Sequence, residues 1–70
     1  MIQEILKFTP REKEVILLFV IGLSYKLIAA ELDISLDTVK TFARNIRAKL
    51  NVNSTPQVVF WANNHDLNDY

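Results

Sequence analysis

Three basic side chains recur at helical spacing in the second half of the chain. Lys40, Arg44 and Arg47 are separated by four and then three residues, which places them on one side of an α-helix. Residues 38–65 contain no carboxylate to neutralise them. Arg and Lys can bind guanine O6 and N7 or the phosphates of a duplex, so this stripe predicts contact with double-stranded DNA.

A helix capped by Ser35 and running to about Leu50 would separate this stripe from a core face. At about 100° per residue the apolar positions form one stripe, and the cations lie about 80 to 140° away from it. The apolar positions are Val39, Phe42, Ala43, Ile46 and Leu50. Thr41 and Asn45 lie further round, at about 200° and 240°. A helix fits the major groove, where Thr and Asn can also contact bases, so we expect this helix to be the DNA-reading element.

The net charge argues against this interpretation at first sight. Eight Lys and Arg balance eight Asp and Glu, for a formal charge of zero. Residues 1–37 hold four basic and six acidic side chains, whereas the only formal charges in residues 38–65 are those of Lys40, Arg44, Arg47 and Lys49. Zero is therefore the sum of a basic block and acidic flanks. A solvated helix face is the alternative explanation of the basic block.

Length and composition exclude several classes of protein. Seventy residues hold a single domain, and half of them are hydrophobic while Gly and Pro together number three, which excludes a disordered chain. The absence of cysteine excludes disulfides and thiolate metal sites. The longest apolar run, residues 15–23, is far shorter than the roughly twenty residues of a membrane span, and the amino terminus lacks the pattern of a signal peptide. We expect a cytoplasmic, nucleoid-associated protein without a membrane partner.

Helix start and stop signals along the chain predict an all-α fold of four helices. Thr9, Pro10 and Glu12 form the start signal of a first helix, with Glu12 closing a capping box, and Gly22 is its stop signal. The β-branched residues within 15–21 leave a strand as the alternative, but the cap and the glycine favour a helix.

The other three helices have their own signals. The second runs from about Tyr25 to Leu32 behind the cap Ser24, and the fourth begins at Thr55 before Pro56 and ends near residues 63–65. Residues 1–8 are a short apolar lead-in that could include a partial helical turn, and residues 9–70 form the domain.

The second and third helices have the pattern of a helix-turn-helix. This motif needs a small residue where its helices cross, a tolerant residue in the turn and apolar residues facing the crossing. Ala29 is the small residue at the crossing. Asp33 is the tolerant residue in the turn, at a position where glycine is commoner. The apolar positions are Ile28, Leu32, Ile34, Val39 and Phe42.

The ordered combination of these motifs resembles the LuxR-type, GerE-like helix-turn-helix family of bacterial transcription regulators over about residues 8–64. The motifs are Thr9-Pro10-Arg11-Glu12-Lys13-Glu14-Val15, Gly22-Leu23-Ser24-Tyr25-Lys26-Leu27-Ile28-Ala29, Leu32-Asp33-Ile34-Ser35, Thr38-Val39-Lys40 and Lys49-Leu50-Asn51-Val52. The resemblance implies a DNA-binding domain whose third helix enters the major groove and whose fourth supports dimerisation. It carries Lys40, Thr41 and Arg44 over as base or groove contacts, and Thr38 and Lys26 as phosphate contacts.

The chain departs from the family in two side chains and in its length. Phe42 stands where the family often has histidine, and Thr55 where it often has arginine. Many members carry a receiver or ligand-binding domain ahead of this module. The chain is therefore expected to be a stand-alone effector of the GerE kind, with an excised or designed domain as the alternative.

The fourth helix carries two large aromatic side chains that are candidates for a homodimer contact. If Val58, Val59 and Ala62 face the core, Phe60 and Trp61 point about 160° and 100° away from it. We predict that both contact a second copy of the chain. The alternative is that Trp61 folds back onto the first helix and Phe60 is a singly exposed apolar residue.

Two further functions are alternatives to a DNA-binding regulator of the LuxR type. Residues 22–29 and 38–40 also resemble region 4 of a sigma factor, although residues 49–52 and the fourth helix favour the LuxR type. The second alternative is an interaction module that dimerises with a full-length regulator and antagonises it. RNA polymerase or such a regulator is accordingly a candidate partner.

Catalysis is not expected from this sequence. The single histidine, His65, has no nucleophile or metal-ligand partner and is expected to interact with the dipole of the last helix. Glu12, Glu14 and Glu31 have the positions of capping and surface groups, and there is no Gly-rich phosphate loop. We expect no cofactor, no metal and no small-molecule ligand.

Overall fold

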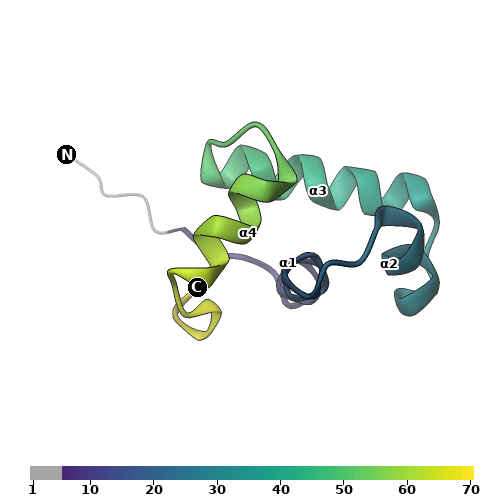
Figure 1. Ribbon diagram of the computed structural model, residues 1–70, viewed down its shortest axis with the longest axis horizontal. Coiled ribbons are helices and arrows are strands. Elements are labelled where there is room, and N and C mark those ends of the chain that lie inside the picture. Colours follow the sequence, from purple (N-terminus) through teal and green to yellow (C-terminus); the bar gives the residue numbers. More distant parts are fainter. Residues whose placement is uncertain (1–5) are drawn as a thin grey trace.

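The computed structural model describes residues 6–70, which form four α-helices and a short 3-10 helix (Figure 1). The α-helices are α1 (Pro10–Ile21), α2 (Tyr25–Leu32), α3 (Leu36–Leu50) and α4 (Thr55–Asn63), and the 3-10 helix is η1 (Leu67–Asp69). The described residues contain no strand, so the predicted all-α class is confirmed and a strand in residues 15–21 is wrong. No helix in residues 6–70 is long and apolar enough to cross a bilayer.

Each α-helix begins at a hydroxyl-bearing cap. The Thr9 side chain accepts from the Glu12 N–H, and the Glu12 carboxylate accepts from the Thr9 N–H at 2.9 Å, which completes the predicted capping box. Ser24 and Ser35 cap α2 and α3 as predicted. For α4 the first residue is the predicted Thr55, and the side chain that caps it is Ser54.

The first three helices end in the same left-handed turn. Gly22, Asp33 and Asn51 have φ of 99°, 55° and 56°, and the residue after each donates its N–H to a carbonyl of the last helical turn. Asp33 is the residue predicted to make the turn of the helix-turn-helix. It takes the place of a glycine because a short polar side chain tolerates this conformation better than most.

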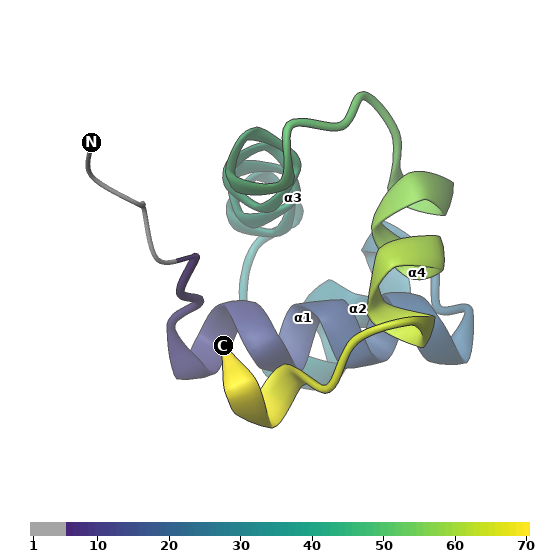
Figure 2. The same ribbon diagram turned by 90° about the vertical axis from the view of Figure 1, so that its left-hand side faces the viewer.

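The core lies where α3 crosses α1 and meets α4. Figures 1 and 2 show α3 running across α1, with α2 and α4 on either side of the crossing and, among residues 6–70, no other helix over the outer side of α3. Its members are mostly β-branched or aromatic and come from every α-helix. They are Phe8, Val15, Ile16, Phe19, Ile28, Ala29, Val39, Ala43, Ile46 and Val58. Ala29 is buried at the crossing of α2 and α3, as predicted.

The two ends of the described chain meet beside α4. Residues 6–9 have no helical turn, and residues 1–5 of the predicted lead-in lie outside the described residues. The Phe8 N–H donates to the Tyr70 carbonyl at 3.2 Å. The Phe8 and Tyr70 rings both pack edge-on against Trp61. The tail after α4, for which the sequence predicted no structure, therefore closes onto the entry to α1.

The buried polar group of the described residues is the carboxylate of Glu12. Its Oε1 accepts from Lys49 Nζ at 2.7 Å, and the same ammonium donates to the Lys7 carbonyl and lies 5.6 Å from the centre of the Phe8 ring. Burial raises the pKa of Glu12, but the hydrogen bonds from Lys49 and the Thr9 N–H, together with the charge of Lys49, outweigh it and hold that pKa below its ordinary value.

We expect Glu12→Gln to lower the free energy of unfolding by about 1–2 kcal/mol at neutral pH, because it removes a charged hydrogen-bond acceptor from a buried site. Since the folded-state pKa of Glu12 is lowered, its stabilisation is complete above the pKa of the unfolded chain, about 4.3, and disappears as the pH falls through the folded value. Urea unfolding of both proteins between pH 7 and pH 3 measures this difference.

Glu14→Gln is the matched control for that measurement. Glu14 pairs with Arg11 at 3.2 Å on the exposed side of α1, where ion pairs contribute little. Its stability should follow that of the parent protein at every pH. A difference between the parent and Glu12→Gln that stayed constant down to pH 3 would contradict the ionic role of Glu12.

Gly22→Ala should lower the free energy of unfolding by about 1–2 kcal/mol, through backbone strain alone. No atom lies within 4 Å of the added Cβ, but φ of 99° is unfavourable for any residue with a side chain. Asp33→Gly is the control, because it places a glycine in a left-handed turn that glycine adopts freely. Its free energy of unfolding should fall by less than that of Gly22→Ala. Thermal unfolding of both variants measures the two effects. A Gly22→Ala protein as stable as the parent would rule out strain at this turn.

Candidate nucleic-acid interface

The two faces of α3 differ sharply in burial. Val39, Ala43 and Ile46 are fully buried on the inner face. The predicted DNA-contacting side chains Lys40, Thr41, Arg44 and Asn45 are all exposed. The spacing therefore predicted correctly which residues of this helix point away from the core.

Lys40 and Arg44 make no side-chain bond to the described residues, so their donors are available to a ligand. Within residues 6–70, neither Lys40 nor Arg44 forms an ion pair or a hydrogen bond through its side chain. Thr41 donates its hydroxyl proton to the Asp37 carbonyl at 3.1 Å, which leaves oxygen lone pairs to accept from a base amino group. Lys40 thus offers an ammonium, Arg44 a planar guanidinium donor and Thr41 a hydroxyl acceptor.

The start of α3 is rigidly capped. Ser35 Oγ accepts from the Thr38 N–H at 3.0 Å and shares a second hydrogen bond of 2.8 Å with Thr38 Oγ1. Both residues are exposed, and the phosphate contact that the resemblance implies for Thr38 stays a prediction. Asp37 in the first turn carries the negative charge that a helix amino terminus favours.

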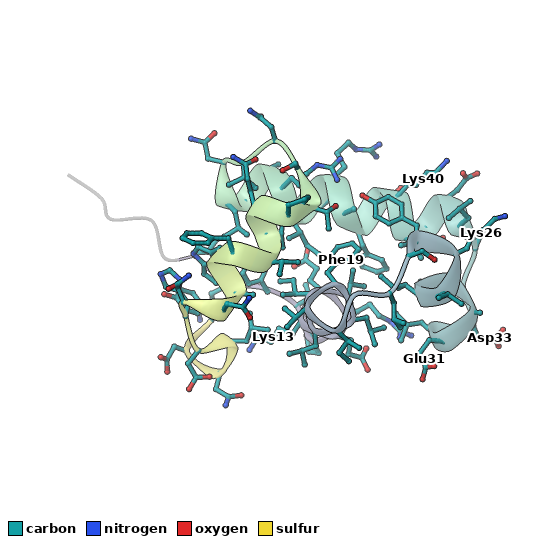
Figure 3. All side chains as sticks on the ribbon, in the orientation of Figure 1. Lys13, Phe19, Lys26, Glu31, Asp33 and Lys40 are labelled. Carbon is teal, nitrogen blue, oxygen red and sulfur yellow. The ribbon has the colours of Figure 1, made fainter. Side chains whose placement is uncertain are left out.

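Lys26 comes from a different helix but lies at the same end of the molecule as Lys40. Figure 3 shows the two lysines where the start of α2 approaches α3, and shows Glu31 and Asp33 at the opposite end of α2. Lys26 and Lys40 thus lie near each other, and Glu31 and Asp33 lie away from them, whereas Asp37 remains in the first turn of α3.

Two basic residues of the block are bonded to other side chains of the domain. Lys49 is exposed, but its ammonium is held by the Glu12 carboxylate at 2.7 Å, so its charge is already paired. Arg47, predicted to contact DNA, is half-buried, and its Nη1 donates to Tyr25 Oη at 3.1 Å. The basic surface is therefore smaller than the sequence suggested.

The positions of Tyr25 and Thr55 beside Arg47 were not predicted from the sequence. The Tyr25 hydroxyl also lies 3.1 Å from Thr55 Oγ1, so one phenol connects the start of α2, the last turns of α3 and the start of α4. These residues are 22 and 30 positions apart, and no local pattern in the sequence joins them. The one available signal was a tyrosine directly after a helix cap, where its hydroxyl needs a partner.

The two aromatic residues predicted for a dimer differ in exposure. Phe60 is 72% exposed, which makes it an exposed large apolar side chain on α4. Trp61 is half-buried and stacks on His65 at 4.5 Å between ring centres, with Phe8 and Tyr70 against its edges. The tryptophan folds back onto the entry to α1 and the tail, and its part in a dimer stays a prediction.

His65 lies just beyond the end of α4. Its Nδ1 is 2.9 Å from the Trp61 carbonyl, one of the last carbonyls of the helix. No group of three or more His, Cys, Asp or Glu in residues 6–70 is arranged to hold a metal ion.

The sequence of this chain is similar to proteins of known class. The family described as bacterial regulatory proteins, luxR family, matches residues 6–62. The monoamine regulon transcriptional regulator of Klebsiella aerogenes is 49% identical over 51 residues, which cover 73% of this chain and 22% of that protein. Response regulator protein VraR of Staphylococcus aureus is 42% identical over 59 residues, which cover 84% of this chain and 28% of that protein.

The chain thus spans about a quarter of the length of these relatives. The match covers α1, α2, α3 and all of α4 except its last residue, Asn63, and so includes the whole helix-turn-helix. The chain belongs to the luxR family of bacterial regulatory proteins, and its four helices are the helix-turn-helix DNA-binding domain of that family.

Proposed function

We propose that this chain is a sequence-specific, double-stranded DNA-binding transcription regulator that places α3 in the major groove. The observation that carries the proposal is the outer side of α3, which no other helix of residues 6–70 covers and which presents Lys40 and Arg44 without a carboxylate partner among those residues. Thr41 and Asn45 lie exposed on the same helix. Such a face offers donors and acceptors of the kinds that read base edges in the major groove.

Charge placement reconciles DNA binding with a net charge of zero. The proposed contacts of one subunit carry four cations, Lys26, Lys40, Arg44 and Arg47, and each neutralised phosphate contributes about 0.9 to the slope of log affinity against log salt. A single subunit is then a weak binder. The proposal therefore includes a homodimer that reads two half-sites, with α4 at the contact between subunits.

The exposed Phe60 supports α4 as the dimer contact. An isolated large apolar side chain on the surface is ordinary, but this one is 72% exposed on a helix whose remaining aromatic residue is already packed. Pairing across a two-fold axis would bury it against its own counterpart. Residues 9–70 would then comprise a DNA-binding face on α3 and a dimer contact on α4, after a lead-in of residues 1–8.

The proposed activity takes place in the cytoplasm and on the nucleoid. The names of the relatives support a role in transcription, since one is a transcriptional regulator and the other a response regulator. An antagonist that dimerises with a full-length regulator is the competing hypothesis, and DNA titrations distinguish the two.

Arg44→Ala and Lys40→Ala should weaken duplex binding while leaving the helical circular dichroism unchanged, because both side chains are exposed and bonded to no described residue. Loss of an arginine that reads guanine should cost about 1–3 kcal/mol and relax specificity at that base pair. Loss of a phosphate contact should weaken binding to every sequence alike. Anisotropy titrations on a duplex selected from a random library, repeated at several salt concentrations, separate the two effects.

Lys13→Ala is the control for those titrations. Lys13 lies on α1, and Figure 3 shows it on the opposite side of the molecule from Lys40, so its removal should leave affinity unchanged. Parent-like binding in both α3 variants would refute α3 as the DNA-reading helix. Undetectable duplex binding by the parent protein at low salt would favour the antagonist.

Phe60→Glu should shift the chain from dimer to monomer without unfolding it, since the side chain is exposed and a charge there is buried only in the dimer. Sedimentation velocity at micromolar concentrations, with and without operator duplex, measures the change. The exposed Ile21→Glu is the control, because it adds the same charge to an apolar site on α1. A parent protein that remained monomeric both alone and on DNA would exclude the dimer.

A further inference from the structure

The hydrogen bonds around Tyr25 have a direction that follows from chemistry. Arg47 has only donors, so its Nη1 donates and Tyr25 Oη accepts, at 3.1 Å. The phenolic proton is then free to point at Thr55 Oγ1, also 3.1 Å away. The chain of bonds runs from the α3 guanidinium through the α2 phenol to the first residue of α4.

The phenol ring is held without help from its hydroxyl. It packs against the buried Phe19 ring at 5.6 Å between ring centres, and Tyr25 is the first residue of α2, directly after the cap Ser24. Removing the oxygen alone should therefore leave the ring in place. The group that loses its position is the guanidinium of Arg47.

Arg47 keeps its charge available although it is half-buried. The basic side chains paired with carboxylates in the described residues are Arg11, with Glu14, and Lys49, with Glu12. Arg47 forms no such pair within residues 6–70 and donates one of its five N–H groups to a neutral oxygen. A partly desolvated guanidinium with free donors is suited to bind an anion.

The place of Arg47 on α3 favours a phosphate over a base. It lies seven residues after Lys40, two turns further along the same side of the helix. In helix-turn-helix domains the amino-terminal part of the reading helix contacts base edges, so a residue near its other end is closer to the backbone of the duplex. Fixing a flexible arginine before binding also reduces the conformational entropy lost on contact.

We propose that Tyr25 is a positioning residue for DNA binding, whose hydroxyl holds Arg47 where α2, α3 and α4 meet so that the guanidinium contacts a backbone phosphate. This inference rests on the proposed function, since it assigns a task within the same DNA-binding face. It adds a residue on α2 that touches no DNA and acts through another side chain.

A double-mutant cycle on DNA affinity tests the inference. Arg47→Ala should lower affinity about tenfold on specific and unrelated duplexes alike and reduce the salt slope by about 1. Tyr25→Phe should lower affinity about three- to tenfold, the effect of one lost hydrogen bond. In the Arg47→Ala background the same substitution should have no further effect, because the residue it positions is absent.

The controls separate positioning from folding. Tyr70→Phe makes the same chemical change in the tail and should leave affinity unchanged, and thermal unfolding of Tyr25→Phe should stay close to that of the parent. Thr55→Val, which removes the last acceptor of the chain of bonds, should weaken binding in the same direction and replaces Tyr25→Phe in the cycle if the latter does not fold.

The outcomes are distinct. Additive losses in the double mutant, or parent-like binding by Arg47→Ala, would overturn the inference while leaving DNA binding intact. A parent protein that binds no duplex would instead overturn the proposed function.

Discussion

The buried carboxylate of Glu12 joins the first helix to the third. It accepts the N–H of Thr9, which starts α1, and the ammonium of Lys49, which lies in the last turn of α3. A buried carboxylate without its cation is costly, so these two helix ends have to stay together. Lys49 also reaches the Lys7 carbonyl and the Phe8 ring, which fixes the entry to α1. The direction in which α3 crosses the core follows from this contact together with apolar packing.

That contact also determines which charges are left for the outside. Lys49, one cation of the basic block, neutralises the buried carboxylate of Glu12. The pair removes one positive and one negative charge from those that the surface presents. The net charge of the chain is unchanged, yet the surface of α3 loses a basic residue at its end and keeps Lys40 and Arg44 in its middle. A neutral total is therefore compatible with a locally positive helix, because charges of opposite sign lie on different sides of the fold.

Local signals predicted the elements of the fold well. The capping box at Thr9, the serine caps and the left-handed Asp33 are properties of neighbouring residues, and each appears in the structure where the sequence placed it. The division of α3 into inner and outer faces also follows from one helical period. The remaining features depend on residues far apart in the chain. Nothing near Glu12 points to Lys49, 37 positions away, and the structure of the tail depends on Phe8 at the other end.

The same limit holds at the candidate site. Helical spacing groups Arg47 with Lys40 and Arg44, but it carries no information on the phenol that another helix brings to Arg47. Trp61 is likewise grouped with Phe60 by position alone, whereas three aromatic partners from both chain ends fix its ring. A periodic pattern reports the direction of a side chain from its own helix. It does not report what a neighbouring element places there.

Few cations per subunit make the geometry between subunits important. Two α3 helices can read successive half-sites only if their separation and orientation match the turn of the duplex, and a subunit with weak electrostatic attraction cannot compensate for a poor match. In the proposed dimer α4 determines that separation. The bonds from Thr55 through Tyr25 to Arg47 attach the first residue of α4 to the DNA-facing helix of the same subunit. A rigid connection at this point would let the contact between two α4 helices fix the distance between two DNA-reading faces.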